Sequence, residues 1–172
     1  MRKMLLNKAV IDTSALFEIL LVNYSLKVSP KDNLCKEVDS VFNGNLRYKN
    51  NYIEFYNSLK IFYSTSQAIG ELHGLINSRL HFKDKLYEKF WEISIDYLKQ
   101  KRLDEKLIEL LTISENNLTK EMIFKIGYVD TGLIELAMKE ELCIITKDRQ
   151  TLRKYAKNMM INVIVLSEYL NY

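Results

Sequence analysis

Short, uninterrupted apolar runs stand near both ends of the chain. They span residues 9–11, 142–145 and 162–166, and a weaker fourth run covers residues 61–63. Because β-branched residues are frequent in these runs and polar residues do not alternate with them, both faces of each strand should be buried, as in a parallel sheet. Helical patterns separate the runs. This order is typical of βαβ units and predicts an α/β fold.

Between these runs, apolar residues recur at the spacing of a helix. The predicted helices cover residues 30–42, 52–59, 64–78, 86–97 and 107–111. Ser29-Pro30 opens the first of them and Gly44 follows its end. Ser64 and Gln67 form a capping-box pattern at the start of the third. Residues 114–127 show no clear pattern.

Composition predicts one ordinary domain over residues 1–172. The chain is 48% hydrophobic and 27% charged, and it has no repeat and no Gly-, Pro- or Ser-rich linker. Lys8, Asp12 and Glu18 break the first apolar stretches below signal-peptide or membrane length, so neither export nor a membrane span is expected. Cys35 and Cys143 match no metal spacing. We interpret them as small core residues in a reducing, cytoplasmic setting.

Two aspartates directly follow predicted strands. Asp12 ends the first strand, at the edge where open parallel sheets bind ligands. Asp148 follows the strand that ends at Thr146 and precedes a helical stretch with Leu152 and Tyr155. Either aspartate could instead be the N-cap of the helix that follows it. Thr146 could orient a metal-bound water or simply end its strand.

Two further acids lie on or beside apolar helix faces. Glu71 borders the apolar face of the helix over residues 64–78, and the alternative is a boundary glutamate paired with a lysine. Asp130 precedes Leu133 and Ile134 by three and four residues, and Ala137 and Met138 continue the same stripe. An inward carboxylate needs a cation or hydrogen-bond donors. The alternative is an N-cap turned back onto its own helix, since Gly127 breaks the chain just before it.

Four carboxylates at strand ends and inward helix faces suit a hard cation such as Mg²⁺ or Mn²⁺. Two such ions activate water and stabilise the leaving oxygen in phosphodiester cleavage. With four of the 22 acids set aside for metal, 25 basic residues face 18 acids, and the balance of +7 suits a polyanionic substrate. Lys147, Arg149 and Arg153 could contact RNA phosphates, or could be part of a solvated helix face.

Taken in order, the motifs resemble the PIN-domain family. They are Val10-Ile11-Asp12-Thr13-Ser14-Ala15, Glu71 within residues 66–72, Tyr128-Val129-Asp130 before residues 133–137, and Ile144-Ile145-Thr146-Lys147-Asp148-Arg149. The resemblance implies a three-layer α/β/α fold with a central, mainly parallel sheet flanked by helices. It implies a Mg²⁺- or Mn²⁺-dependent endoribonuclease acting on RNA. Asp12, Glu71, Asp130 and Asp148 would be the catalytic, metal-binding acids, and Thr13, Ser14 and Thr146 would be supporting hydroxyls.

The same resemblance implies homodimers and, for toxin-like members, an antitoxin or other protein partner. One feature departs from those compact members: 59 positions separate Asp12 from Glu71. We interpret the extra length as a helical insertion around residues 23–60, which argues against the toxin branch. Two other functions stay open. One is a catalytically silent PIN-like module that binds RNA or a protein, and the other is a flap-type DNA nuclease, which lacks support because no long basic helical arch is visible.

Overall fold

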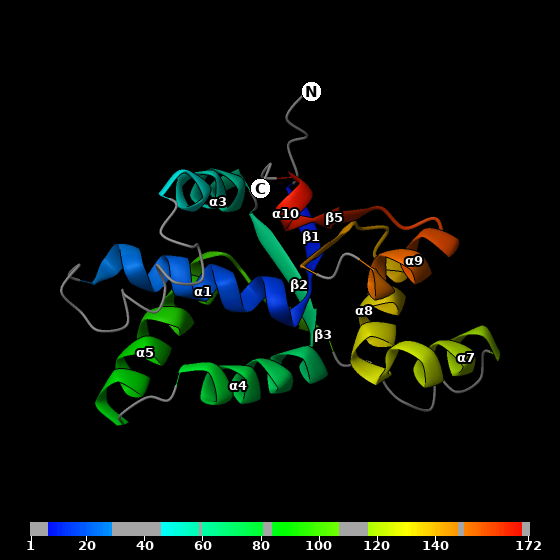
Figure 1. Cartoon of the computed structure of the whole chain (residues 1–172), viewed down its shortest axis with the longest axis horizontal. Coiled ribbons are helices and arrows are strands. Elements are labelled where there is room, and N and C mark those ends of the chain that lie inside the picture. The colour runs from blue at the N-terminus through cyan, green and yellow to red at the C-terminus, as the bar shows by residue number, and fades with distance from the viewer. Residues whose placement is uncertain are drawn as a thin grey trace.

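The computed structural model describes residues 7–28, 46–58, 60–80, 84–106, 117–147 and 150–169. Within them, five strands form one sheet: β1 (Lys8–Ile11), β2 (Ile61–Thr65), β3 (Asp104–Lys106), β4 (Ile144–Thr146) and β5 (Val163–Val165). All neighbouring strands are parallel, in the order β3-β2-β1-β4-β5 (Figure 1). The predicted α/β class and the parallel sheet are confirmed.

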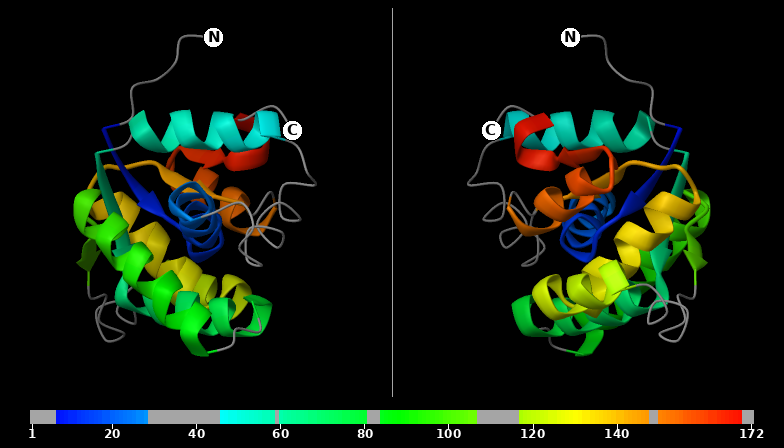
Figure 2. Two further views of the ribbon diagram at one scale, coloured as in Figure 1. Left: turned by 90° about the vertical axis from the view of Figure 1, so that its left-hand side faces the viewer. Right: turned by 90° about the vertical axis from the view of Figure 1, so that its right-hand side faces the viewer.

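Helices flank the sheet on both faces (Figures 1 and 2). One side holds α1 (Thr13–Lys27), α3 (Leu46–Ser58), α4 (Ser66–Leu80) and α5 (Asp84–Gln100). The other side holds α7 (Asn117–Ile126), α8 (Tyr128–Lys139) and α9 (Thr151–Asn158). A short helix, α10 (Leu166–Tyr169), follows β5. The arrangement is a three-layer α/β/α fold.

Alternate residues of each central strand face opposite cores. In β1, Ala9 and Ile11 pack with the helices around α1, whereas Val10 packs with α8 and α9. In β4, Ile145 faces the first core and Ile144 the second. Because successive side chains of a strand point to opposite faces, a strand buried on both faces needs an unbroken apolar run. This explains why the apolar runs predicted these strands.

Helix α1 lies at the centre of the larger core. Every side chain from Ala15 to Tyr24 is buried, and α3, α4 and α5 contact it. Leucines such as Leu16 and Leu20 are fully buried, and each such burial contributes about 1.5–3 kcal/mol relative to exposure. A helix buried on nearly all sides shows little amphipathic contrast. The charged Glu18 is therefore out of place among these residues.

The predicted strands are confirmed to within two residues at each end, and the weak fourth run forms β2. The sequence did not predict β3, whose residues Asp104-Glu105-Lys106 have no apolar pattern. This strand lies at the edge of the sheet and, among the described strands, pairs with β2 alone. An edge strand can carry charged side chains, which discourage pairing with other chains.

Two details of the helices differ from the prediction. The cap of α4 is Thr65, whose hydroxyl accepts the Ala68 N–H at 3.2 Å, whereas Ser64 belongs to β2 and donates to the Ile11 carbonyl at 3.1 Å. The unassigned segment 114–127 contains α7. The predicted helices over 30–42 and 107–111 lie outside the described residues, and so does much of the predicted insertion.

In the part of the chain described here, none of the helices has the length and apolar character that crossing a membrane requires. Cys143 is half-buried against the first core, and burial raises the pKa of its thiol. Cys35 lies outside the described residues.

Candidate functional site

Asp12 lies directly after β1, in the N-cap position of α1. Its backbone is extended, with φ −75° and ψ 151°, but its side chain makes no capping hydrogen bond to the helix. Instead, its Oδ2 accepts hydrogen bonds from two hydroxyl groups, that of Ser14 and that of Thr146, the latter at 2.7 Å. The alternative that the Asp12 side chain merely caps α1 is therefore wrong.

The pairing of β1 with β4 brings Asp12 and Thr146 together. Ile11 is in register with Ile145, so the next residue of each strand stands at the carboxyl edge of the sheet. The Asp12 N–H also donates to the Ile145 carbonyl at 2.9 Å. Thr146 is fully buried and Asp12 is 8% exposed. The two hydroxyl groups replace part of the hydration that this buried carboxylate loses.

Thr13 connects this strand end to α4. Its hydroxyl lies 3.1 Å from the Ala68 carbonyl oxygen and 3.3 Å from Oε2 of Glu71. Since one hydroxyl has one proton, these two acceptors share it. Glu71 is solvent-exposed, and its observed partner is this threonine. The alternative pairing of Glu71 with a lysine is not what the structure shows among the described residues.

Asp12 and Glu71 line the same cavity, of about 400 Å³. Its other walls are Thr13, Ser14, Leu75 and Ser78. Among the described residues, Oδ1 of Asp12 and Oε1 of Glu71 have no hydrogen-bond partner, so one oxygen of each carboxylate is available to a ligand. Asp12 and Glu71, which are 59 positions apart in the sequence, therefore line one cavity.

Asp12, which lines this cavity, lies at the point where the strand order reverses. The chain builds β1, β2 and β3 outward in one direction and then returns to place β4 on the other side of β1. Open parallel sheets bind ligands at the carboxyl ends of the strands next to this switch point. Asp12 and Thr146 stand on the two strands that flank it.

Asp130 is half-buried in the first turn of α8. The N-cap of α8 is Gly127, so the alternative that Asp130 caps this helix is wrong. Gly127 has φ 88° and ψ 167°, a conformation that is essentially confined to glycine. The following Tyr128 accepts a hydrogen bond from Gln67 at 3.3 Å, which joins the start of α8 to the start of α4. Asp130 thus belongs to the carboxyl edge of the sheet as well.

The predicted inward stripe of α8 is confirmed except at its end. Leu133, Ile134 and Ala137 are buried, whereas Met138 is 46% exposed. Met138 is near the last turn of α8, where the helix passes the amino-terminal edge of the sheet. Met138 there lines a second cavity instead of the core.

Asp148 and Arg149 lie outside the described residues. Within the described part of the chain, Asp12, Glu71 and Asp130 do not make a group of three or more side chains arranged to hold a metal ion. The structure thus brings Asp12, Glu71 and the three predicted hydroxyls of Thr13, Ser14 and Thr146 together, and it places Asp130 at the same edge of the sheet.

Two of the predicted RNA-binding cations are engaged by acids. Lys147 binds the carboxylate of Glu18, and burial lowers the pKa of this lysine. Arg153 binds Glu168 at 2.6 Å in a pair that is about half exposed. Glu18 was missed as a site residue. The signal was present, because it is the single charge within the apolar run from Leu16 to Val22.

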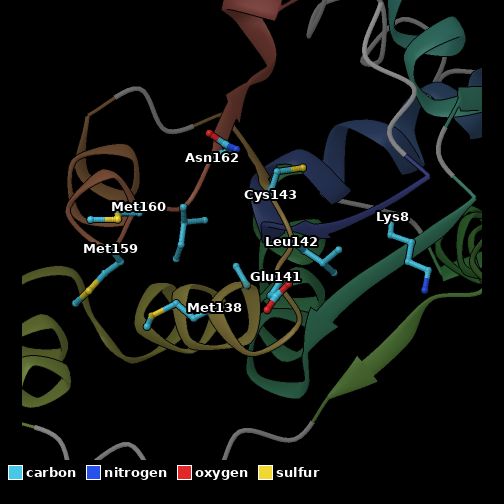
Figure 3. Close-up of a pocket in the computed structure, with 10 residues that line it drawn as sticks. Lys8, Met138, Glu141, Leu142, Cys143, Met159, Met160 and Asn162 are labelled. Carbon is cyan, nitrogen blue, oxygen red and sulfur yellow. The ribbon is translucent and has the colours of Figure 1, made fainter.

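A larger cavity, of about 490 Å³, lies at the opposite, amino-terminal edge of the sheet (Figure 3). Its lining includes Met138, Met159 and Met160 as well as the charged Lys8 and Glu141. Met138, Met159 and Met160 gather on one side of the cavity, and the Cys143 side chain points away from them (Figure 3). With one acid and no converging polar groups among its lining residues, this cavity has less to offer for phosphodiester chemistry than the smaller one.

The fold and the smaller cavity define an α/β protein with a carboxylate pocket at the switch point of an all-parallel sheet. Comparison of the chain with models of protein families, with curated proteins and with solved structures gave no match. The likeness to PIN domains consequently rests on the sequence motifs.

Proposed function

We propose that the protein is a metal-dependent endoribonuclease of PIN type. The observation that carries the proposal is that Asp12 and Glu71 line one cavity, with Asp12 at the switch point and held there by the hydroxyls of Ser14 and Thr146. Asp130 belongs to the same edge of the sheet, and the motif assigns Asp148, which directly follows Lys147, to the same site.

The residues present fit a hard divalent cation. The cavity offers carboxylate and hydroxyl oxygens, which Mg²⁺ and Mn²⁺ prefer, and the described residues that line it include no histidine or cysteine, the ligands that softer metals favour. Asp12 and Glu71 would hold the ion together with Asp130 and Asp148. When bound, such ions supply an activated water and stabilise the leaving oxygen of a phosphodiester.

Hydroxyl groups beside Asp12 and Glu71 orient their carboxylates for metal binding. Ser14 and Thr146 both donate to Oδ2 of Asp12, which fixes the carboxylate and leaves Oδ1 toward a ligand. Thr13 acts in the same way on Oε2 of Glu71. Hydrogen bonds that orient metal-binding carboxylates typically change metal affinity by about 10–100-fold when they are removed.

The net positive charge of the chain outside the four acids supports a polyanionic substrate such as RNA. Outside the four acids the chain carries a net charge of +7, and Arg149 and Arg153 stand next to or soon after the fourth acid in sequence. Phosphate contacts from such residues would orient an RNA strand beside the cavity. A cytoplasmic location is a further part of the proposal and follows from the cysteine usage. Homodimers, and an antitoxin or other protein partner, come from the resemblance alone.

One observation favours a second function, a catalytically silent module that binds RNA or a protein. Lys147 and Arg153, two of the cations expected to face RNA, are paired with Glu18 and Glu168. Paired cations offer less net charge to a phosphate backbone than free ones. The nuclease would cleave RNA and the silent module would not, so an RNA cleavage assay distinguishes them.

The deciding experiment uses the purified full chain on labelled single-stranded RNA and DNA with Mg²⁺, Mn²⁺ or EDTA. We expect RNA cleavage with either metal and none with EDTA. Glu71→Gln should abolish it, whereas Glu88→Gln, which removes an exposed carboxylate on α5, should not. Binding of RNA without cleavage under any metal condition would support the silent module, and cleavage of DNA alone would support the flap-type nuclease.

A further inference from the structure

Glu18 is a buried carboxylate that the proposed chemistry does not use. Its exposure is 3%, and it lies in the middle of α1 among residues of the larger core. Among the described residues, Asp12 and Glu18 are the two buried carboxylates, and the same strand-to-helix segment carries both. Glu18 stands one helical turn after Ser14, so the two side chains share a face of α1.

The partner of Glu18 adjoins the site. Its Oε1 accepts a hydrogen bond from the Lys147 ammonium. Lys147 directly follows Thr146, which donates to Asp12. Two consecutive residues at the end of β4 therefore bind two acids of the β1–α1 segment, Thr146 with Asp12 and Lys147 with Glu18.

Stability alone does not account for this acid. Taking a carboxylate out of water carries a desolvation penalty, and an ion pair recovers it only in part when one partner stays half exposed, as Lys147 does. An apolar side chain of similar volume would pack at this position with no charge to compensate. What the pair adds is a fixed connection between α1 and the chain leaving β4.

We propose that Glu18 is a positioning residue of the carboxylate pocket. Through Lys147 it fastens the end of β4 to α1, and the Thr146 hydroxyl is thereby kept on Oδ2 of Asp12. The oxygen Oδ1 of Asp12 then keeps its direction toward a cation. The effect of Glu18 on catalysis rests on the proposed function, whereas its effect on the position of the Thr146 hydroxyl does not. It also assigns Lys147 to the support of the pocket and not to RNA phosphates.

Glu18→Gln tests the proposal, because glutamine keeps the shape and removes the charge, and the half-exposed Lys147 can then turn toward water. In metal-free protein, we expect the NMR resonance of the Thr146 methyl group to shift. In titrations with Mn²⁺ alone, followed by calorimetry, we expect the affinity to fall by about tenfold. Lys147→Arg, which can maintain the ion pair, should retain the wild-type affinity.

Glu168→Gln is the matched control, since it breaks the exposed ion pair with Arg153. It should leave both the Thr146 resonance and the Mn²⁺ affinity unchanged. If Glu18→Gln proves unfolded, the apolar pair Glu18→Met with Lys147→Met replaces it, with the same expected losses.

An unchanged Thr146 resonance together with wild-type Mn²⁺ affinity in the Glu18 variant overturns the positioning role. A Lys147→Met variant that loses RNA affinity but keeps Mn²⁺ affinity also overturns it, because Lys147 would then be an RNA contact. Failure of the proposed function gives a different result. The wild-type protein would then fail to cleave RNA while the Thr146 resonance still responds to Glu18→Gln.

Discussion

The Thr146 hydroxyl donates a hydrogen bond of 2.7 Å to Oδ2 of Asp12, across 134 positions of the sequence. Thr146 ends β4 and Asp12 directly follows β1, the adjacent strands on either side of the switch point of the sheet. Because Thr146 is fully buried and its acceptor is a carboxylate, this contact contributes to stability as well as to the geometry of the pocket.

Replacing Thr146 by valine keeps the volume and removes the hydroxyl. Hydrogen bonds to charged groups contribute about 1.5–3 kcal/mol, so we expect the free energy of unfolding to fall by about 2 kcal/mol. Urea unfolding at neutral pH measures this. Thr146→Ser, which retains a hydroxyl, should lose less than Thr146→Val. A Thr146→Val variant as stable as wild type, with a loss in Thr146→Ser alone, would mean that packing of the methyl group, and not the hydrogen bond, is what matters.

Gly127 sets the start of the helix that carries Asp130. Its φ of 88° and ψ of 167° are strained for any residue with a side chain, so Gly127→Ala should lower the free energy of unfolding by about 1–3 kcal/mol. Gly74→Ala is the control, because Gly74 lies within α4 and an added methyl group there would meet open space. At this position alanine should stabilise the protein by about 0.5–1 kcal/mol. A Gly127→Ala variant that is as stable as wild type, or more stable, would contradict the strain at Gly127.

Burial of Tyr97 raises the pKa of its phenol above the ordinary value of 10.0. The folded protein therefore retains this proton at pH values where the unfolded chain has lost it. The stability that Tyr97 contributes is fully present below pH 10 and is lost as pH rises above it, by about 1.4 kcal/mol per pH unit. Urea unfolding of wild type and Tyr97→Phe between pH 8 and 11 isolates this effect. Parallel curves for the two proteins would contradict it.

How much of the fold could be predicted from the sequence depended on burial. Strands such as β1 and β4 are buried on both faces, and their unbroken apolar runs made them predictable. The edge strand β3 has one neighbour and an exposed face, so its charged residues gave no pattern. The ends of these strands could also be predicted, because Asp12 and Thr146 interrupt apolar runs at the carboxyl edge of the sheet.

The partners of the site residues were harder to predict. Sequence spacing indicated which face Glu71 occupies, but it could not indicate that Thr13 would be its partner, because that contact depends on the packing of α1 against α4. The pairing of Glu18 with Lys147 likewise joins residues 129 positions apart. The apolar residues around Glu18 marked it as unusual without revealing its partner.

RNA binding should depend steeply on salt, because phosphate contacts release counterions. Charge reversal at Arg149 or Arg153 should reduce the slope of log K against log salt by about one for each phosphate that is no longer neutralised. Filter binding of a labelled RNA from low to moderate salt, with EDTA present to prevent cleavage, measures the slope. Glu168→Gln, which releases Arg153 from its partner, should keep or steepen it. A slope that neither reversal changes would assign these arginines to a solvated face.

The most direct measurement is Mn²⁺-dependent RNA cleavage by Asp12→Asn, with thermal unfolding of the same variant in the presence and absence of Mn²⁺. Asparagine can still accept hydrogen bonds from Ser14 and Thr146, so the metal-free variant should melt no lower than wild type. Removal of the charge should abolish cleavage and weaken the stabilisation by Mn²⁺. A folded, inactive variant with a reduced Mn²⁺-induced shift in Tm is the predicted result. Full Mn²⁺-dependent cleavage by Asp12→Asn would contradict the proposed role of this carboxylate.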